Sequence, residues 1–314
     1  MESRVPLLRV LVLLAAFLFV PSVAAIPWQT YTCAGKTYKG KTIEDIYNNA
    51  LEMAERARER VYAVRHANFA KFLKPDEPFA CMANNIKWLW GTKPHAHLKT
   101  LTSADKDALD TVIANYDKAI NMLKSGNVVL YCDSEAWDWL ETLSFMLGAW
   151  THRVSSTEQY IRLKDAGQML PIGEERKPIC SDNMLGSTSS GHREVTNEAG
   201  MVVDRQTVHT IILCLGLHTR QPATLSADYT PAVSSRFGNP DDYGSAAGTL
   251  LHEIFHTLGE GYDDKVIHGN FAYRYSNAVS LAQTRQADAL YNPDNYRIFA
   301  EMSMAHSKTR WGAA

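Results

Sequence analysis

The chain has 314 residues, 46% of them hydrophobic, and its formal net charge is −2 from 32 basic and 34 acidic side chains. A net charge so close to zero gives no field that would attract nucleic acid, an anionic membrane or a strongly charged protein, so we expect no nucleic-acid partner. The length is sufficient to bury a large hydrophobic core.

The first 25 residues predict a secretory signal peptide. Arg4 and Arg9 flank a polar start, residues 10–20 are almost wholly apolar, and small residues at 21–25 offer a cleavage site. An anchoring helix is the alternative, but the apolar run is shorter than the ~20 residues of a membrane span. We therefore expect a secreted, extracellular protein with no stable membrane association, in which one domain occupies residues 26–314.

The cysteines agree with an oxidising compartment, because all five follow the predicted signal peptide. Since five is an odd number, at most two disulfides close within the chain and one thiol is left over. None of the cysteines has the C-x-x-C spacing of a structural zinc site or a redox pair.

The first half of the chain predicts helices. Apolar residues recur at helical spacing over residues 42–73, which predicts one long amphipathic helix, and again over residues 102–126, where the Thr102 hydroxyl can cap the first turn. The aromatic segment 137–150 predicts a third helix. Residues 152–192 contain no recognisable element and are interpreted as a surface insertion.

The second half predicts a hairpin followed by more helices. Two β-branched runs, residues 194–203 and 207–217, flank a turn at 204–206. Ser245 is a plausible N-cap for a helix over residues 246–258. Further helical patterns cover residues 276–290 and 292–306. We predict an α+β fold that is mostly helical with a small β-sheet.

The helix predicted over residues 246–258 carries the sequence His-Glu-Ile-Phe-His at 252–256. Side chains at positions i and i+4 lie on one face of a helix, so His252 and His256 can bind one metal ion. Glu253 lies beside that face, where it can act as a general base toward a metal-bound water. The pattern is that of zinc metalloproteases.

A catalytic zinc needs a third protein ligand and an open position for water. After the predicted helix, Gly259 lets the chain turn back, which brings Asp263 and Asp264 into range. The spacing used by metzincins falls instead on Tyr262, a poor zinc ligand, and a glutamate on a later helix would have to be Glu301. The residues alone leave Asp263 and Asp264 as alternatives.

Three blocks of the sequence resemble one family. They are residues 248–256 around the His-Glu-Ile-Phe-His motif, residues 261–264 followed by His268 and Gly269, and residues 291–301. With these blocks the chain resembles the deuterolysin and peptidyl-Lys metalloendopeptidase group, called aspzincins because their third zinc ligand is an aspartate. The resemblance covers most of the chain after residue 25 and implies a zincin-like metalloprotease domain.

The resemblance also implies roles for individual residues. His252, His256 and Asp264 would bind one Zn²⁺ per chain, with Glu253 as the general base. His268 stands where the family has a tyrosine thought to face the substrate carbonyl, and it could donate a hydrogen bond to the developing oxyanion as a tyrosine does.

The third block matches the region that binds a substrate lysine in lysine-specific members. Asp294 corresponds to one of two carboxylates thought to bind that lysine. The second position holds Arg297, a cation that would repel a lysine unless it pairs with Asp294. Strict lysine specificity is therefore not expected. Alternatively, Asp294 is a helix N-terminal residue favoured by the helix dipole.

By the same resemblance, Cys33 would pair with Cys132 and Cys180 with Cys214, leaving Cys81 free. The implied activity is that of a secreted zinc metalloendopeptidase, a monomer, which hydrolyses protein or peptide substrates through a zinc-activated water. The strand around Leu213 would pair with the substrate backbone. Two alternatives remain: an inactive secreted binding or toxin-like protein on the same scaffold, and a metzincin-like protease with a different third ligand.

Overall fold

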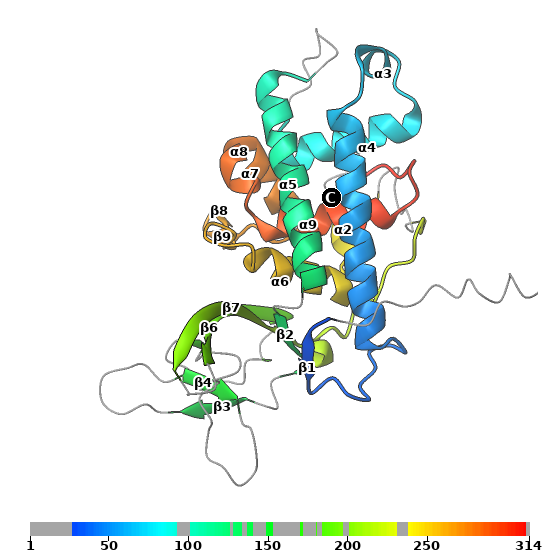
Figure 1. The fold of residues 1–314 in the computed structure, drawn as a ribbon. Helices are drawn as coiled ribbons and strands as arrows, with labels where there is room; N and C mark the ends of the chain where they lie inside the picture. The colour runs from blue at the N-terminus through cyan, green and yellow to red at the C-terminus, as the bar shows by residue number, and fades with distance from the viewer. Residues whose placement is uncertain are drawn as a thin grey trace, which may run out of the picture.

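A computed structural model describes residues 27–92, 101–125, 128–133, 137–140, 149–152, 170–171, 180, 184–196, 201–230 and 238–311. The predicted signal peptide and most of the predicted insertion at 152–192 lie outside these residues. Within the described part of the chain, no helix is both long and apolar enough to cross a bilayer. The fold is α+β, mostly helical with a small sheet, as predicted (Figure 1).

The elements follow one another as a helical first part, a β-rich middle and a helical end. The helices are α2 (Ile43–Arg65), α3 (Phe69–Leu73), α4 (Glu77–Trp90), α5 (Ser103–Ser125), α6 (Ala246–His256), α7 (Tyr275–Thr284), α8 (Gln286–Ala289) and α9 (Pro293–Met304), with 3₁₀ turns η1 (Leu215–Leu217) and η2 (Pro240–Tyr243). The strands are β1 (Gln29–Tyr31), β2 (Val128–Tyr131), β3 (Trp137–Leu140), β4 (Ala149–His152), β5 (Leu170–Pro171), β6 (Gly186–Thr196), β7 (Val202–Leu213), β8 (Val266–Ile267) and β9 (Asn270–Phe271).

Helix α6 lies at the centre of the molecule, between a layer of helices and the main sheet. It packs against α2, α5 and α9 on one side and against β6 and β7 on the other (Figure 1). Its apolar side chains, including Leu250, Ile254 and Phe255, are fully buried. Since full burial of one such side chain stabilises a fold by roughly 1.5–3 kcal/mol, this packing fixes the position of α6 firmly.

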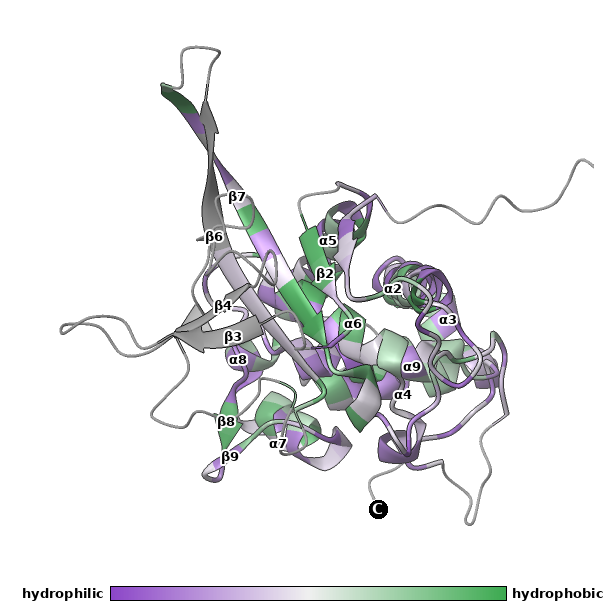
Figure 2. Ribbon diagram, turned by 90° about the horizontal axis from the view of Figure 1, so that it is seen from below, coloured by the Kyte–Doolittle hydropathy of each residue, from purple (hydrophilic) through white to green (hydrophobic). Residues whose placement is uncertain are grey.

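The main sheet has the strand order β1-β2-β7-β6. The β1–β2 and β2–β7 pairs are parallel, whereas β6 and β7 form an antiparallel hairpin that extends past the helices (Figure 2). Leu213 lies on β7, which is paired on both sides in the sheet, so the prediction that this strand pairs with substrate is wrong. The edge strand next to α6 is β6.

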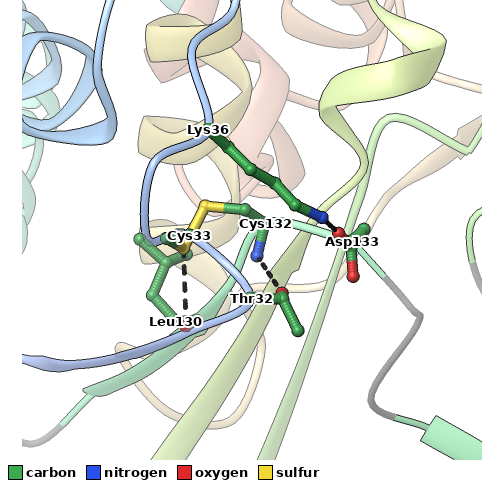
Figure 3. Close-up of a disulfide and its surroundings, with 6 residues drawn as sticks. All are labelled: Thr32, Cys33, Lys36, Leu130, Cys132 and Asp133. Atoms are coloured by element: carbon green, nitrogen blue, oxygen red, sulfur yellow. Dashed lines mark hydrogen bonds and ion pairs between the residues drawn. A yellow bond between two sulfur atoms is a disulfide. The ribbon is translucent and has the colours of Figure 1, made fainter.

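A disulfide ties the first strand to the second. Cys33 and Cys132 are bonded just beyond the ends of β1 and β2, and the backbone N–H of Cys132 donates to Thr32 Oγ1 at 3.1 Å (Figure 3). An ion pair between Lys36 and Asp133 closes the same corner. The second predicted disulfide, Cys180–Cys214, is also formed, and Cys81 is a buried free thiol, so all three predictions are confirmed.

Helices α2, α5 and α6 begin where the sequence predicts. Thr42 begins α2 with a capping box, because its hydroxyl accepts from the N–H of Asp45 while the Asp45 side chain accepts from the N–H of Thr42. Thr102 and Asp105 form the same arrangement at the start of α5, as predicted. Ser245 caps α6 by accepting from the N–H of Gly248 at 2.9 Å, which is also as predicted.

The predicted helix ends, and the elements predicted for the middle of the chain, agree less well with the structure. The helix predicted over 42–73 ends at Arg65, because Asn68 caps a separate short helix, α3, with a bond to the N–H of Lys71. The prediction of a helix at 137–150 is wrong, since this segment contributes strands β3 and β4. Its sequence starts Trp-Asp-Trp, the period-two alternation typical of a strand.

The hairpin is confirmed, but its turn is not at 204–206. These residues belong to β7, where Asp204 pairs with Val195 of β6. The β-branched residues on both sides continue the ladder through this polar stretch. Strand β6 also begins at Gly186, so the last residues of the predicted insertion are part of the main sheet.

Candidate metal centre

Three potential ligands lie together near the C-terminal end of α6: His252 and His256 from the helix, and Asp264 from the segment before β8. The Nε2 atoms of His252 and His256 lie 3.1 Å apart, and Oδ1 of Asp264 lies 3.3 Å from the first and 3.6 Å from the second. In a tetrahedral zinc site with bonds of ~2.0–2.1 Å, two ligand atoms are about 3.3 Å apart. The three atoms therefore have the spacing of three corners of a zinc tetrahedron.

Hydrogen bonds on the far side of each ring orient the two histidines. Nδ1 of His256 donates to the carbonyl of Tyr262 at 2.6 Å, and Nδ1 of His252 donates to Oδ1 of Asp294 at 3.1 Å. With the proton on Nδ1, each ring directs its Nε2 lone pair at the common point. Acceptors of this kind are the usual partners of metal-binding histidines, because they fix the tautomer and raise the basicity of the ligand.

The third ligand atom has no other partner in the described part of the chain. Oδ1 of Asp264 is buried and makes no hydrogen bond, although a buried carboxylate oxygen is costly to leave unpaired. Its other oxygen, Oδ2, accepts a hydrogen bond of 2.6 Å from the hydroxyl of Tyr273. A cation between Asp264 and the two histidines would satisfy Oδ1, so the residues fit a bound metal.

The charges around His252 favour a cation as well. Burial by itself would lower the pKa of the His252 ring, but the carboxylates of Asp264 and Asp294 outweigh it and raise that pKa to about 10. Burial opposes ionisation of Asp264 too, yet the neighbouring histidines hold the pKa of its carboxyl below the usual range. The protein without metal therefore holds a proton in this cluster, and a zinc ion would displace it.

A buried network of charges lies behind His252. Arg297 binds both oxygens of Asp294, with Nε 2.7 Å from Oδ1 and Nη2 3.1 Å from Oδ2, while its Nη1 lies 2.7 Å from Oε2 of Glu301. Oε1 of Glu301 accepts from the N–H of Ser245 at 2.8 Å. This network joins α9 to the N-terminus of α6 and to a ring nitrogen of His252.

Within this network, neither carboxylate oxygen of Asp294 is free to bind a substrate. Its side chain is only 4% exposed, and Oδ2 also accepts from the N–H of Arg274 at 3.1 Å. Both oxygens are engaged by the protein itself, so this placement gives no support to the predicted role in binding a substrate lysine. Instead, the carboxylate orients His252.

Glu253 points toward strand β6. Its Oε2 accepts a hydrogen bond of 2.7 Å from Thr188, and the side chain is buried. Gly186, two residues earlier on the same strand, has no side chain, and a Cβ at that position would lie 2.6 Å from Oε1 of Glu253. Strand β6 therefore holds the carboxylate on one side and leaves room for it on the other.

The structure does not bring every predicted residue to this centre. His268 is exposed at the turn between β8 and β9, where its Nε2 lies 3.2 Å from Oγ of Ser280, so it makes no described contact with the ligands. Asp263 is also exposed. Tyr262 contributes only its carbonyl, because its hydroxyl donates to Asn115 at 2.5 Å. Glu301 lies at the opposite end of α6.

Sequence reasoning missed three residues of the site: Gly186, Thr188 and Tyr273. The first two fall in a Gly/Ser-rich stretch that was interpreted as an insertion, and no local signal marks them. Tyr273 reaches the site through the β8–β9 hairpin, whose two-residue turn is formed by His268 and Gly269, both with positive φ (51° and 77°). A hairpin at that point brings a residue nine positions after Asp264 back beside it.

Comparison with known proteins adds little. No family model matches the chain, and no curated protein matches it. Among solved structures, the chain is similar to a zinc peptidase from Grifola frondosa, with 16% identity, a TM-score of 0.29, and coverage of 81% of this chain and 93% of that chain. So low a TM-score gives no basis for transferring a function from that protein to this chain.

Proposed function

We propose that this protein is a secreted, zinc-dependent metalloendopeptidase of the aspzincin type. The observation that carries the proposal is the convergence of His252 Nε2, His256 Nε2 and Asp264 Oδ1, with ligand spacings of 3.1–3.6 Å and a carboxylate at position 253 beside them. Three protein ligands leave the fourth position of a tetrahedral zinc open, which is the arrangement of a catalytic site.

Zinc, when bound, would lower the pKa of a coordinated water and polarise the carbonyl of the scissile peptide bond. Glu253 then acts as the general base: its carboxylate takes a proton from the attacking water and passes it to the leaving amine. Thr188 holds one oxygen of Glu253, which restricts the carboxylate to a single orientation. The products are a carboxylic acid and an amine, so one water is consumed for each bond cut.

Tyr273 replaces His268 as our proposed oxyanion donor. Its hydroxyl bonds to Asp264, and its ring centroid lies 6.0 Å from that of His252. Burial, and then the neighbouring carboxylate of Asp264, raise the pKa of Tyr273, so the phenol stays protonated and remains a donor. A small rotation would let the hydroxyl donate to charge that develops on the substrate carbonyl oxygen.

Strand β6 provides a place for an extended substrate. It is the edge strand of the main sheet, it packs on α6, and its residue Thr188 contacts Glu253. A peptide added to this edge would form main-chain hydrogen bonds, and so would be recognised without regard to most of its side chains. The substrate class is therefore protein or peptide.

Substitution of Glu253 tests the proposal. Glu253→Gln keeps the shape of the side chain but removes the base, so we expect one zinc per chain by metal analysis and a loss of casein cleavage of about 100- to 10,000-fold. Wild-type cleavage should stop with a chelator and return with zinc. Full activity in Glu253→Gln would refute the mechanism, and zinc binding without cleavage of any peptide by the wild type would favour the inactive binding protein.

The choice between neighbouring aspartates has its own test. Asp264→Asn should lose zinc, whereas Asp263→Asn should keep it, because only Asp264 faces the two histidines. The opposite result would favour a different third ligand. Secretion accords with the two disulfides of the structure, and detection of the mature protein in culture medium, with its N-terminus near residue 26, would test it.

A further inference from the structure

The β8–β9 hairpin has two different faces. Val266 pairs with Phe271 and Ile267 with Asn270, so the first pair projects to one side and the second to the other. Ile267 and Ala272 are buried in a small core with Leu281 of α7 and Ala289 of α8. The face with Val266 and Phe271 is directed away from that core.

The exposed face continues into the metal centre. In an extended strand, residues two positions apart lie on one face, so Asp264 shares the face of Val266, and Tyr273 shares that of Phe271. The two residues lie just beyond the β8–β9 ladder, which the bond from the N–H of Ala272 to the carbonyl of Lys265 extends by one step, and their side chains meet in the hydrogen bond between Tyr273 and Asp264. The pair that reaches the metal site and the Val266–Phe271 pair are therefore neighbours on one surface, roughly 7 Å apart.

This surface is apolar and open. Val266 is 44% exposed, Phe271 is 52% exposed and Tyr273 is 41% exposed, and the rings of Phe271 and Tyr273 stack with centroids 5.2 Å apart. We call these three residues the apolar ledge. Large apolar side chains exposed side by side are typical of binding sites, whereas single exposed ones need no explanation.

Two basic side chains near the hairpin, those of Lys265 and Arg285, bond to other groups of the protein. Nζ of Lys265 donates to the carbonyl of Gly261 at 2.6 Å, and Arg285 pairs with Asp288 and donates to the carbonyl of Val266 at 2.8 Å. The ledge thus presents aromatic and aliphatic atoms. An apolar side chain that lies on the ledge would gain by leaving water, whereas a charged group placed there would lose part of its hydration.

We propose that the apolar ledge is a substrate subsite that selects a large apolar or aromatic side chain within two residues of the bond that is cut. The inference rests on the proposed peptidase function, because its occupant is a peptide held at the metal centre. Extended peptides advance about 3.3 Å per residue, so a residue one or two positions from the scissile bond reaches the ledge. Tyr273 contacts Asp264 of the metal centre and also stacks on Phe271 of the ledge, so a side chain bound on the ledge lies next to the proposed catalytic residues.

A peptide series tests this subsite. Fluorogenic peptides would carry Phe, Leu, Ala, Lys or Glu at each of the two positions on either side of the cut bond. At one position we expect kcat/KM to be about tenfold higher for Phe or Leu than for Ala. Phe271→Ser and Val266→Ser should reduce that ratio to within about twofold. Phe69→Ser, which changes an exposed phenylalanine on α3, should leave the ratio unchanged.

A binding measurement separates the subsite from catalysis. In the Glu253→Gln background, anisotropy of a labelled peptide should show about tenfold tighter binding for Phe than for Ala, and Phe271→Ser should abolish the difference. Metal analysis of each variant shows whether the zinc site is intact. Cleavage without an apolar preference, or a preference that persists in the Phe271→Ser, Val266→Ser double variant, would overturn the inference alone. No cleavage of any peptide by the zinc-loaded wild type would overturn the peptidase function with it.

Discussion

The side of the metal centre formed by α9 is buried and charged, whereas the side formed by the β8–β9 hairpin is exposed and largely apolar. On the first side, Arg297 forms ion pairs with Asp294 and Glu301, whose side chains are only 4% and 3% exposed. On the second, Tyr273 and Phe271 keep about half of their surface open. We propose that the buried side positions the metal ligands, whereas the open side is available to a substrate.

The largest expected effect concerns the buried side. Arg297→Met would leave two carboxylates with side chains only 4% and 3% exposed without their cation. Removal of one partner from a buried ion pair typically costs about 3–5 kcal/mol. Urea denaturation should show a loss of this size, while Arg310→Met, which breaks an exposed pair with Glu77, should change stability by less than about 1 kcal/mol. Equal effects would mean that the network is not important for the fold.

The next effect concerns the open side. Tyr273→Phe removes only a hydroxyl, so zinc content should stay at one per chain while kcat falls by about 100-fold, the usual cost of losing an oxyanion donor. His268→Ala should change kcat by no more than about twofold, because its ring lies at the hairpin turn and not at the ligands. If His268→Ala had the larger effect, the oxyanion donor would be His268 after all.

A third prediction returns to the buried side, where Asp294 accepts a hydrogen bond from His252. Asp294→Asn should weaken zinc binding by about 10- to 100-fold in a chelator competition, as is usual when a histidine ligand loses its carboxylate. Asp241→Asn provides a matched control, because Asp241 caps α7 through the N–H of Tyr275 and contacts no ligand. Unchanged zinc affinity in Asp294→Asn would show that this carboxylate is not a positioning residue.

The last prediction concerns the pH dependence of stability. Burial raises the pKa of Glu301 to about 7, although Arg297 and Ser245 oppose the shift. The pKa of Glu301 in the folded protein lies above its unfolded value of 4.5, so the folded state holds this proton more tightly than the unfolded state does. The stability that the protonated side chain contributes is therefore complete below pH 4.5 and is lost as the pH rises through 7. The slope is at most about 1.4 kcal/mol per pH unit. Relative to the wild type, Glu301→Gln should lack this slope in urea titrations between pH 4.5 and 7, and an identical slope in both would contradict the assignment.

Short sequence patterns predicted the starts of α2, α5 and α6 correctly, because the hydrogen bonds that stabilise a helix start join residues close together in the chain. The capping residues Thr42, Thr102 and Ser245 bond to N–H groups within three residues, so the start of a helix can be identified from a short stretch. The same reasoning failed at 137–150, where aromatic residues fit either a helix or a strand and long-range pairing decides. It also failed at 204–206, because a polar stretch can stay within a long hairpin when its partner strand is present.

By itself, the sequence determined the metal-binding motif, because the i and i+4 geometry that pairs His252 with His256 is a property of any helix. It also identified the cysteines that pair, through a resemblance that covers most of the chain after residue 25. Only the tertiary structure placed Asp264, and not Asp263, beside the two histidines, brought Tyr273 to this cluster in place of His268, and turned Asp294 inward against His252 and Arg297. Each of these outcomes depends on how β8, β9 and α9 fold back onto α6, and contacts between distant segments have no local signature in the sequence.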